Sequence, residues 1–394
     1  MAQLGIRLDP ARTGRAAESL LDGLRHWIVG QDAAIAEIVN IFQMHITGMS
    51  PLGRPIGSFL FLGPTGSGKT RIVEATAKCL VGSPSAAIKI DCGEFQHSHE
   101  IAKLIGSPPG YLGHRETSPL LCQETLDRYH TERVKISFVL FDEIEKASDA
   151  LWNLLLGILD KGTLTLGDNR RVDFSRAMIF MTGNLGAARM SAIMAPRLGF
   201  NIAAPAPGAE LAGTLSQAAI EAARRRFTPE FINRLDKIVV FKPLGEAELR
   251  KILDIELRLV QQRIFRFAPH AFVFSVTEPA KDHLLAQGTD LKYGARHLKR
   301  AIERLLVQPI SNLIVTEQVR TGDWIQVDFD PRENRMSFMK VAQGTPAYAM
   351  AQALENPLPL PAAELTDRSL QSRLGRNQPH TEPRPKGAVR PALI

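Results

Sequence analysis

A glycine-rich segment at residues 63–70, Gly-Pro-Thr-Gly-Ser-Gly-Lys-Thr, constrains the fold of this chain more than any other feature. It follows an apolar run at 59–62 and precedes a helical pattern at 71–80. A strand, a glycine-rich loop and a helix start, in this order, form a cradle whose backbone N–H groups point at an anion. Lys69 can reach the β- and γ-phosphates of a nucleotide, and Thr70 offers a hydroxyl to Mg²⁺. The predicted nucleotide contacts are Thr65, Gly66, Ser67, Gly68, Lys69 and Thr70.

Length and composition limit the class of protein. With 394 residues the chain is too long for one small core, which predicts two structured domains with tails. No apolar run approaches the roughly 18 residues that span a membrane, and residues 1–15 lack a secretory apolar core, so a cytoplasmic location is expected. The three cysteines form no C-x-x-C pair and are expected to be reduced, structural thiols. The net charge of +7 is mild and lies partly in the C-terminal tail, which favours a solvated tail over a nucleic-acid surface.

Apolar runs alternate with helical patterns between residues 18 and 242. Strands are expected at 59–62, 87–90, 136–141, 176–181 and 237–241, and helices at 32–45, 100–104, 119–129, 151–159 and 217–226. This alternation predicts an α/β fold, a three-layer P-loop domain with a parallel sheet and right-handed crossovers. In such sheets the ligand lies at the carboxyl ends of the strands.

The pattern changes after residue 242. Long helices are expected at 247–265, 278–287 and 295–306, with an alternating strand at 323–329. These features predict a small, mostly helical C-terminal domain at 243–331 with a short strand pair. Flexible or disordered chain is expected for the N-terminus at 1–17, for the Ala/Pro/Gly-rich loop at 195–214 within the first domain, and for the tail at 342–394.

Two carboxylates, Asp142 and Glu143, follow the apolar run at 136–141. An Asp at the end of a buried strand beside a phosphate loop can hold Mg²⁺, directly or through water. A neighbouring Glu can orient and deprotonate a water that attacks the γ-phosphate. The alternative is a pair of solvated strand-end acids, but the cradle upstream favours the catalytic interpretation.

Three further polar residues are candidates for the same site. Asn184 follows the strand at 176–181, and the topology of a parallel sheet brings it to the same edge as the two acids. It can hydrogen-bond the attacking water or the γ-phosphate, although an Asn after a strand can also be a simple turn former. Arg234 and Arg296 are candidates for balancing the negative charge that develops during hydrolysis, but composition does not select them from other arginines.

Longer segments resemble the Clp ATPases of the AAA+ superfamily, and among these the second ATPase module of ClpB, ClpA and ClpC. The resemblance covers about residues 17–330 and is carried by the runs at 57–66, 142–147, 181–186, 231–234 and 293–300. It implies an ATPase that uses ATP and Mg²⁺. Lys69 and Thr70 then belong to the Walker A motif, and Asp142 and Glu143 to Walker B.

The resemblance also implies roles for residues outside these two motifs. Asn184 matches the first sensor, and Arg296 matches the second sensor, which reads the nucleotide from the small domain. Arg234 matches the arginine finger, which acts on the nucleotide of a neighbouring subunit. Ile28 and Val29 match the segment that packs on adenine.

Residues 110–113, at the end of a loop rich in breakers at 106–113, match the family's pore loop. By this resemblance Tyr111 and Leu112 line a central pore, in which the aromatic side chain grips a translocating polypeptide. A homo-hexameric ring that acts on unfolded or misfolded proteins is implied. Residues 114–118 depart from the family's acidic, glycine-containing run after this loop. No segment within the 394 residues resembles the first ATPase module or the coiled-coil middle domain of ClpB, or the cysteine-rich zinc domain of ClpX.

Three functions are considered. The first is a stand-alone, single-ring unfoldase or remodelling chaperone. The second is the ATPase subunit of a ClpP-like compartmental protease, for which Leu198-Gly199-Phe200 is the candidate docking tripeptide; a chance apolar triplet in a loop is the alternative. The third is a nucleotide-switched scaffold on DNA or a membrane complex. Because no basic cluster with interleaved aromatic residues stands out, neither a nucleic-acid nor a membrane partner is expected.

Overall fold

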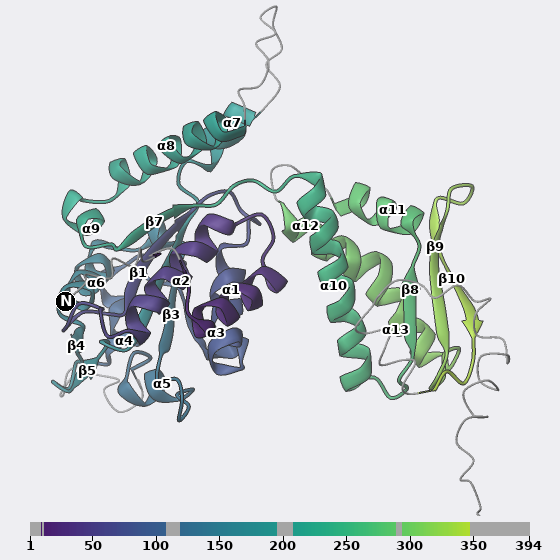
Figure 1. Cartoon of the computed structure of the whole chain (residues 1–394), viewed down its shortest axis with the longest axis horizontal. Helices are drawn as coiled ribbons and strands as arrows, with labels where there is room; N and C mark the ends of the chain where they lie inside the picture. The colour runs from purple at the N-terminus through teal and green to yellow at the C-terminus, as the bar shows by residue number, and fades with distance from the viewer. Residues whose placement is uncertain (1–8, 10–11, 108–118, 195–207, 289–293, 347–394) are drawn as a thin grey trace, which may run out of the picture. The chain divides into compact units, whose positions relative to one another are not determined.

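The computed structural model of the chain describes residues 9, 12–107, 119–194, 208–288 and 294–346. The described residues form two compact units, shown in Figure 1 with colour running along the chain. The first contains residues up to 257 together with 281–309, and the second contains 258–280 together with 310–346. The domain boundary predicted between residues 242 and 243 stays a prediction.

The first unit is built on a five-stranded parallel sheet in the order β2-β3-β6-β1-β7. Its strands are β1 (Gly57–Leu62), β2 (Ala87–Asp91), β3 (Ser137–Asp142), β6 (Ala177–Gly183) and β7 (Lys237–Val240). All of the residues of β1 and β6 are buried, as expected for inner parallel strands that are covered on both faces. The predicted parallel α/β sheet is therefore confirmed.

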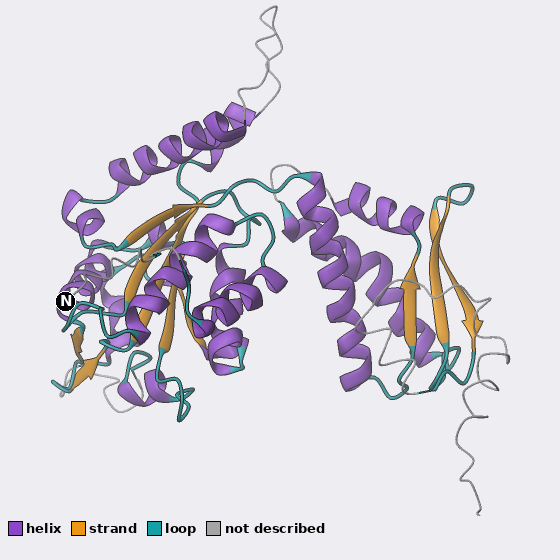
Figure 2. Ribbon diagram, in the orientation of Figure 1, coloured by secondary structure: helices purple, strands orange, loops and turns teal. Residues whose placement is uncertain are grey.

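Side chains of successive strand residues enter two separate cores, because they point to opposite faces of the sheet. Phe59, Phe61 and Phe180 pack with α1, α2 and α3, and the rings of Phe59 and Phe180 stack with centroids 5.0 Å apart. Leu60 and Leu62 pack on the opposite face with α6 and α8. Figure 2 shows the helices around the sheet. These helices are α1 (Arg15–Trp27), α2 (Asp32–Ile46), α3 (Lys69–Val81), α6 (Asp149–Lys161) and α8 (Gly208–Arg226).

Several smaller elements differ from the sequence prediction. The helix expected at 119–129 is reduced to α5 (Gln123–Asp127), and a hairpin of β4 (Thr163–Thr165) and β5 (Arg171–Asp173) was not expected. Residues 208–214 of the loop predicted at 195–214 belong to α8, and α1 starts within the predicted flexible segment 1–17. The remaining elements of this part are α4 (Ala102–Ile105), α7 (Ala187–Met194), α9 (Pro229–Asn233) and short 3₁₀ turns at Pro84–Ala86, Cys92–Glu94, Ser98–Ile101 and Ile144–Lys146.

Helices dominate the chain after β7, as predicted. They are α10 (Glu246–Phe267), α11 (Glu278–Gly288), α12 (Ala295–Ile302) and α13 (Gln308–Val315), and a π-helical turn at Glu303–Val307 separates the last two. In the second unit, β9 (Trp324–Asp330) and β10 (Arg335–Ala342) form the predicted strand pair, which is antiparallel, and β8 (Val273–Val276) adds a third strand parallel to β9.

The end of this unit extends past the start of the predicted disordered tail at residue 342. Ala342 ends β10, and the N–H of Thr345 donates to the carbonyl of Gly322 at 2.7 Å. Residues 347–394 lie outside the described part. Among the helices that the structure describes, none has the length and apolar composition needed to cross a membrane.

Candidate nucleotide site

The glycine-rich loop connects β1 to α3, as the sequence predicts, and the helix begins at Lys69, two residues before the predicted start. Gly66 and Gly68 have φ angles of +77° and +101°, in the left-handed region that L side chains rarely adopt. No described heavy atom lies within 4 Å of the point where a Cβ of Gly68 would stand, so backbone conformation rather than space requires glycine there. Gly68 also precedes the first residue of α3, where free N–H groups and the helix dipole favour an anion.

Lys69 is the buried cation of this loop, with 7% of its surface exposed. Its Nζ donates to the carbonyls of Gly63 and Pro64 at 2.8 and 2.9 Å and to Oδ1 of Asn184 at 2.9 Å. Burial lowers the pKa of the Lys69 amine to about 8, against the opposing effect of Asp142 and two neighbouring carboxylates. Because the amine has no ion-pair partner among the described residues, it suits a phosphate group that would supply the missing negative charge.

Asp142 lies at the carboxyl end of β3, beside the start of α3. The Thr70 hydroxyl is 3.4 Å from Oδ2 of Asp142, and the Thr182 hydroxyl donates to Oδ1. A hydroxyl and a carboxylate side by side at a phosphate loop are hard oxygen ligands of the kind that Mg²⁺ prefers. Thr70 and Asp142 therefore fit the predicted metal site.

Glu143 follows Asp142 with a φ angle of +55°, which is uncommon for a residue other than glycine. Its backbone N–H donates to the Thr182 hydroxyl at 3.1 Å, so one threonine contacts both acidic residues. The Glu143 carboxylate forms an ion pair with Lys146 and accepts a hydrogen bond from Nδ2 of Asn184 at 3.3 Å. Left-handed backbone at such a position is the kind of strain that is often found at functional sites.

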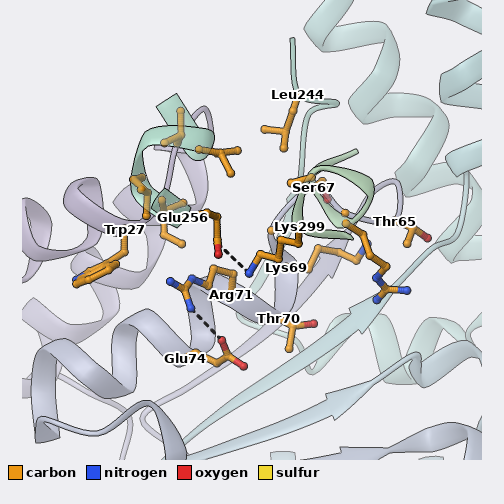
Figure 3. A pocket seen from close by; sticks show the side chains of 18 of the residues that line it. Trp27, Thr65, Ser67, Lys69, Thr70, Arg71, Glu74, Leu244, Glu256 and Lys299 are labelled. Carbon is orange, nitrogen blue, oxygen red and sulfur yellow. Dashed lines mark ion pairs between the residues drawn. The ribbon is translucent and has the colours of Figure 1, made fainter. Parts of the chain in front are cut away.

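These groups line one cavity of about 290 Å³ within the first unit, shown close by in Figure 3. Of the predicted site residues, the cavity is lined by Ile28, Val29, Thr65, Gly66, Ser67, Gly68, Lys69, Thr70, Asp142, Glu143, Asn184 and Arg296. The sequence therefore identified residues that the fold brings together from five separate segments.

Apolar side chains also line the cavity. They are Trp27, Ile28, Val29, Leu244, Ile252 and Ile255. Apolar lining in the same cavity as a phosphate cradle suits the base of a nucleotide. Gln31 connects the loop to the segment after β7, because its Nε2 donates to the carbonyls of Ser67 at 3.1 Å and Lys242 at 2.9 Å.

Arg296 lies at the start of α12, which approaches the glycine-rich loop. The N–H of the preceding residue, Ala295, donates to the Gly66 carbonyl at 3.3 Å. Lys299, one turn along α12, forms an ion pair with Glu256 of α10 at 2.9 Å, and both line the cavity. The cation of Arg296 is near enough to Lys69 to contribute to lowering its pKa.

Of the predicted site residues that the structure describes, Arg234 does not line the cavity. Arg234 caps α9, and its guanidinium lies 2.9 Å from the Glu230 carboxylate and 3.8 Å from that of Asp160. Tyr111 and Leu112, the predicted pore residues, lie outside the described residues, as does the tripeptide at 198–200. The pore and docking predictions therefore stay predictions.

Sequence reasoning missed several residues that line the cavity. Trp27, Arg71 and Glu74 adjoin predicted motifs, Ala295 precedes Arg296, and Lys299 follows Arg296 by one helical turn. Their positions beside these motifs in the sequence could have identified them. The others come from the segment at 244–256, namely Leu244, Ile252, Ile255 and Glu256, where an amphipathic pattern alone carries no sign of a ligand.

Protein-family models match two parts of the chain. Residues 54–238 match the AAA domain (Cdc48 subfamily), and residues 244–327 match the C-terminal, D2-small domain, of ClpB protein. The two segments follow one another in the order expected for a Clp ATPase module.

Individual relatives agree with these matches. The chaperone protein ClpB of Bdellovibrio bacteriovorus is 39% identical over 309 residues, which are 78% of this chain and 33% of the relative. The chloroplastic chaperone protein ClpC2 of Arabidopsis thaliana is 34% identical over 336 residues, 84% of this chain and 34% of the relative. The chain thus spans about a third of the length of these relatives.

Solved structures show the same fold. The Saccharomyces cerevisiae Hsp104:casein complex in its extended conformation matches with a TM-score of 0.70 and 28% identity, over 83% of this chain and 53% of that chain. A closed-state reconstruction of Hsp104 with ATPγS and FITC casein matches with a TM-score of 0.68 and 28% identity, over 82% and 51%. The chain therefore belongs to the Clp family of AAA+ ATPases, as its motifs indicated.

Proposed function

We propose that this chain hydrolyses ATP and uses the reaction to unfold or remodel other proteins, as a Clp-type unfoldase. The observation that carries the proposal is the convergence of the phosphate loop, the two strand-end acids, Asn184 and Arg296 on one cavity. Membership of the Clp family and the likeness to Hsp104, whose solved complexes contain casein, support the choice of protein as substrate.

The hydrolysis step assigns a separate task to each group. The loop N–H groups and Lys69 hold the β- and γ-phosphates, and Thr70 with Asp142 would hold Mg²⁺. When bound, this ion neutralises charge that develops on the phosphate oxygens. Glu143 takes a proton from a water as the water oxygen attacks the γ-phosphorus and the bond to ADP breaks. Asn184, which contacts both Lys69 and Glu143, orients the water or the γ-phosphate.

The same proposal includes a homo-hexameric ring. Arg234 is outside its own chain's nucleotide cavity, which supports action on the nucleotide of a neighbouring copy. Arg296 reads the nucleotide within its own chain from a small domain at 243–331, and Ile28 and Val29 pack on adenine. Tyr111 and Leu112 grip the polypeptide in the central pore. The alternative, a subunit of a ClpP-like protease, depends on residues 198–200 and draws no support from the described residues.

ATP-dependent unfolding of a tagged fluorescent protein by the purified full-length chain tests the proposed function. We expect fluorescence to fall with ATP but not with ADP, and Lys69→Ala to abolish the effect. The variant Tyr111→Ala should hydrolyse ATP normally but unfold slowly. Full-rate unfolding by Tyr111→Ala would exclude the pore role, and ATP hydrolysis without any unfolding or remodelling would exclude the unfoldase.

The size of the assembly tests the ring independently. Glu143→Gln should trap ATP, so this variant should elute as a hexamer with ATP and Mg²⁺ and as smaller species without them. A monomer under all nucleotide conditions would contradict the proposed ring.

A further inference from the structure

The 3₁₀ turn Ile144–Lys146, directly after Glu143, holds the backbone of Asn184. Oε1 of Glu145 accepts a hydrogen bond from the Asn184 N–H at 2.8 Å. Because the Asn184 side chain in turn contacts Lys69 and Glu143, this bond sets where the amide group stands at the phosphate end of the cavity. Glu145 does not line the cavity itself, so its contribution would be to position Asn184.

Only one oxygen of the Glu145 carboxylate is hydrogen-bonded among the described residues. Its second oxygen, Oε2, is buried and has no hydrogen-bond partner among the described residues. A buried carboxylate oxygen without a partner is costly, so the surrounding structure must hold the side chain in place.

Two side chains donate hydrogen bonds to successive backbone carbonyls of the turn. Arg226, at the end of α8, donates from Nε and Nη2 to the Glu145 carbonyl at 3.1 and 2.8 Å. Trp152 of α6 donates from its indole N–H to the Ile144 carbonyl at 3.1 Å. The Arg226 guanidinium also lies over the Trp152 ring, 4.4 Å from its centroid, so the two donors support each other.

This pair of donors connects to the helix that ends at Arg234. The Trp152 ring packs edge-on against Phe227 at 5.5 Å, and Phe227 stacks on Phe231 of α9 at 5.2 Å. Phe227 and Phe231 are both buried, and Arg234 is the residue after α9. An unbroken series of contacts therefore joins α9 to the turn that holds Asn184.

We propose that Glu145 is a positioning residue for Asn184, and that Arg226 and Trp152 transmit the position of α9 to it. The inference rests on the proposed function, in which Arg234 acts on the nucleotide of a neighbouring subunit. The contacts connect Arg234 to the nucleotide site of its own subunit. A shift of α9 on contact with a neighbour changes the hold on the turn, and the turn moves Asn184 relative to Lys69 and Glu143. Hydrolysis in one subunit thereby responds to the occupancy of the next.

Contact alone does not establish coupling, so the test measures it. Hydrogen exchange of the full-length, nucleotide-free protein reports on the Asn184 amide without any activity. We expect exchange in the peptide covering 182–186 to become roughly tenfold faster in Glu145→Ala and also in Arg226→Ala. Arg225→Ala, an exposed neighbour on α8, is the matched control and should leave that peptide unchanged. Unchanged exchange in Arg226→Ala would overturn the proposed transmission.

Steady-state kinetics gives the second readout. Glu145→Ala should lower kcat for ATP by roughly 10- to 100-fold while KM changes little, because misplacement of Asn184 affects the reaction step more than nucleotide binding. Glu145→Gln keeps an amide oxygen for the Asn184 N–H and should recover most of kcat. Arg226→Ala should lower kcat in the same way and reduce the cooperativity of the ATP response.

The outcomes separate this inference from the proposed function. A wild-type chain without ATPase activity contradicts the proposed function, while the exchange experiment still decides the Glu145 contact. Wild-type hydrolysis together with unchanged kcat and exchange in Glu145→Ala overturns the inference alone. Should Glu145→Ala fail to fold in a melting experiment, Arg226→Ala and Glu145→Gln decide the question.

Discussion

The side-chain oxygen of Asn184 accepts a hydrogen bond from the Lys69 amine at 2.9 Å, between residues 115 positions apart in the sequence. The bond joins the phosphate loop, which follows β1, to the end of β6. Strands β1 and β6 are direct neighbours in the sheet. The Lys69 amine is buried and contacts a neutral amide oxygen instead of a carboxylate, so it has no ion pair among the described residues. The loop is therefore prepared for an anionic ligand before one binds.

The pH dependence of nucleotide binding should report the ionisation of Lys69. In the nucleotide-free chain the pKa of this amine is lowered to about 8, and a bound phosphate favours the charged form. Above about pH 8, binding must therefore take up a proton, and affinity for ATP should fall by up to about tenfold per pH unit. Binding of a fluorescent ATP analogue between about pH 7 and pH 9.5 measures this slope.

Lys69→Arg is the control, because a guanidinium stays charged throughout this range. Its affinity, even where weaker than that of the wild type, should be flat with pH above 8. A slope of equal size in both proteins would show that another group titrates.

Replacing the predicted base should separate binding from hydrolysis. Glu143→Gln keeps the size of the side chain and the backbone hydrogen bond to Thr182, so ATP should still bind with near wild-type affinity. Without a carboxylate to take the proton from water, kcat should fall by roughly 10²- to 10⁴-fold. Single-turnover hydrolysis and equilibrium binding measure the two effects, and rapid turnover by this variant would contradict the role of Glu143.

Thr182 should matter for both stability and catalysis, although it does not line the cavity. Its hydroxyl donates to Asp142 and accepts the N–H of Glu143, and the residue is 1% exposed. Thr182→Val keeps the shape but leaves both groups without this partner, which should cost about 1–3 kcal/mol of unfolding free energy. We also expect a lower apparent affinity for Mg²⁺ in the activity assay, since Asp142 loses an orienting hydrogen bond.

Thr182→Ser retains the hydroxyl and should stay close to wild type in both measurements. Denaturant unfolding gives the free energy, and titration of activity with Mg²⁺ gives the apparent affinity for the metal. Equal behaviour of the Val and Ser variants would show that the hydroxyl is dispensable.

The sequence was sufficient for those parts of the fold and site that are encoded in contiguous segments. Strand β1, the loop and the start of α3 lie in one run of residues, and the apolar runs before Asp142 and Asn184 mark inner strands of a parallel sheet. Because the carboxyl ends of parallel strands meet at one edge, the sheet topology alone brought Asp142, Glu143 and Asn184 together.

The remaining features depend on tertiary contacts that have no local pattern. Glu256 and Ile252 lie on the amphipathic helix α10, where the same spacing serves a core or a cavity. Glu145 and Arg226 act through side-chain to backbone hydrogen bonds between distant segments, which residue spacing does not specify. The hairpin of β4 and β5 has strands of three residues each, too short to give a readable alternation.

Arg234 gives the most direct prediction about assembly. Its guanidinium pairs with Glu230 and Asp160 and does not line its own nucleotide cavity, so Arg234→Ala should bind ATP normally but hydrolyse it poorly. Lys69→Ala should not bind ATP, but it retains an intact Arg234. If the arginine acts on a neighbour, mixing the two inactive variants recreates complete sites wherever the Arg234→Ala subunit binds ATP beside a Lys69→Ala subunit.

An equal mixture with random assembly forms complete sites at about a quarter of the interfaces, so we expect up to about a quarter of the wild-type ATPase rate. Each variant alone, at the same total concentration, should stay near background. The matched control mixes Lys69→Ala with the double variant Lys69→Ala/Arg234→Ala, in which no subunit binds ATP and no activity should return. If the first mixture also stays at background while size measurements show mixed rings, Arg234 does not act across the interface.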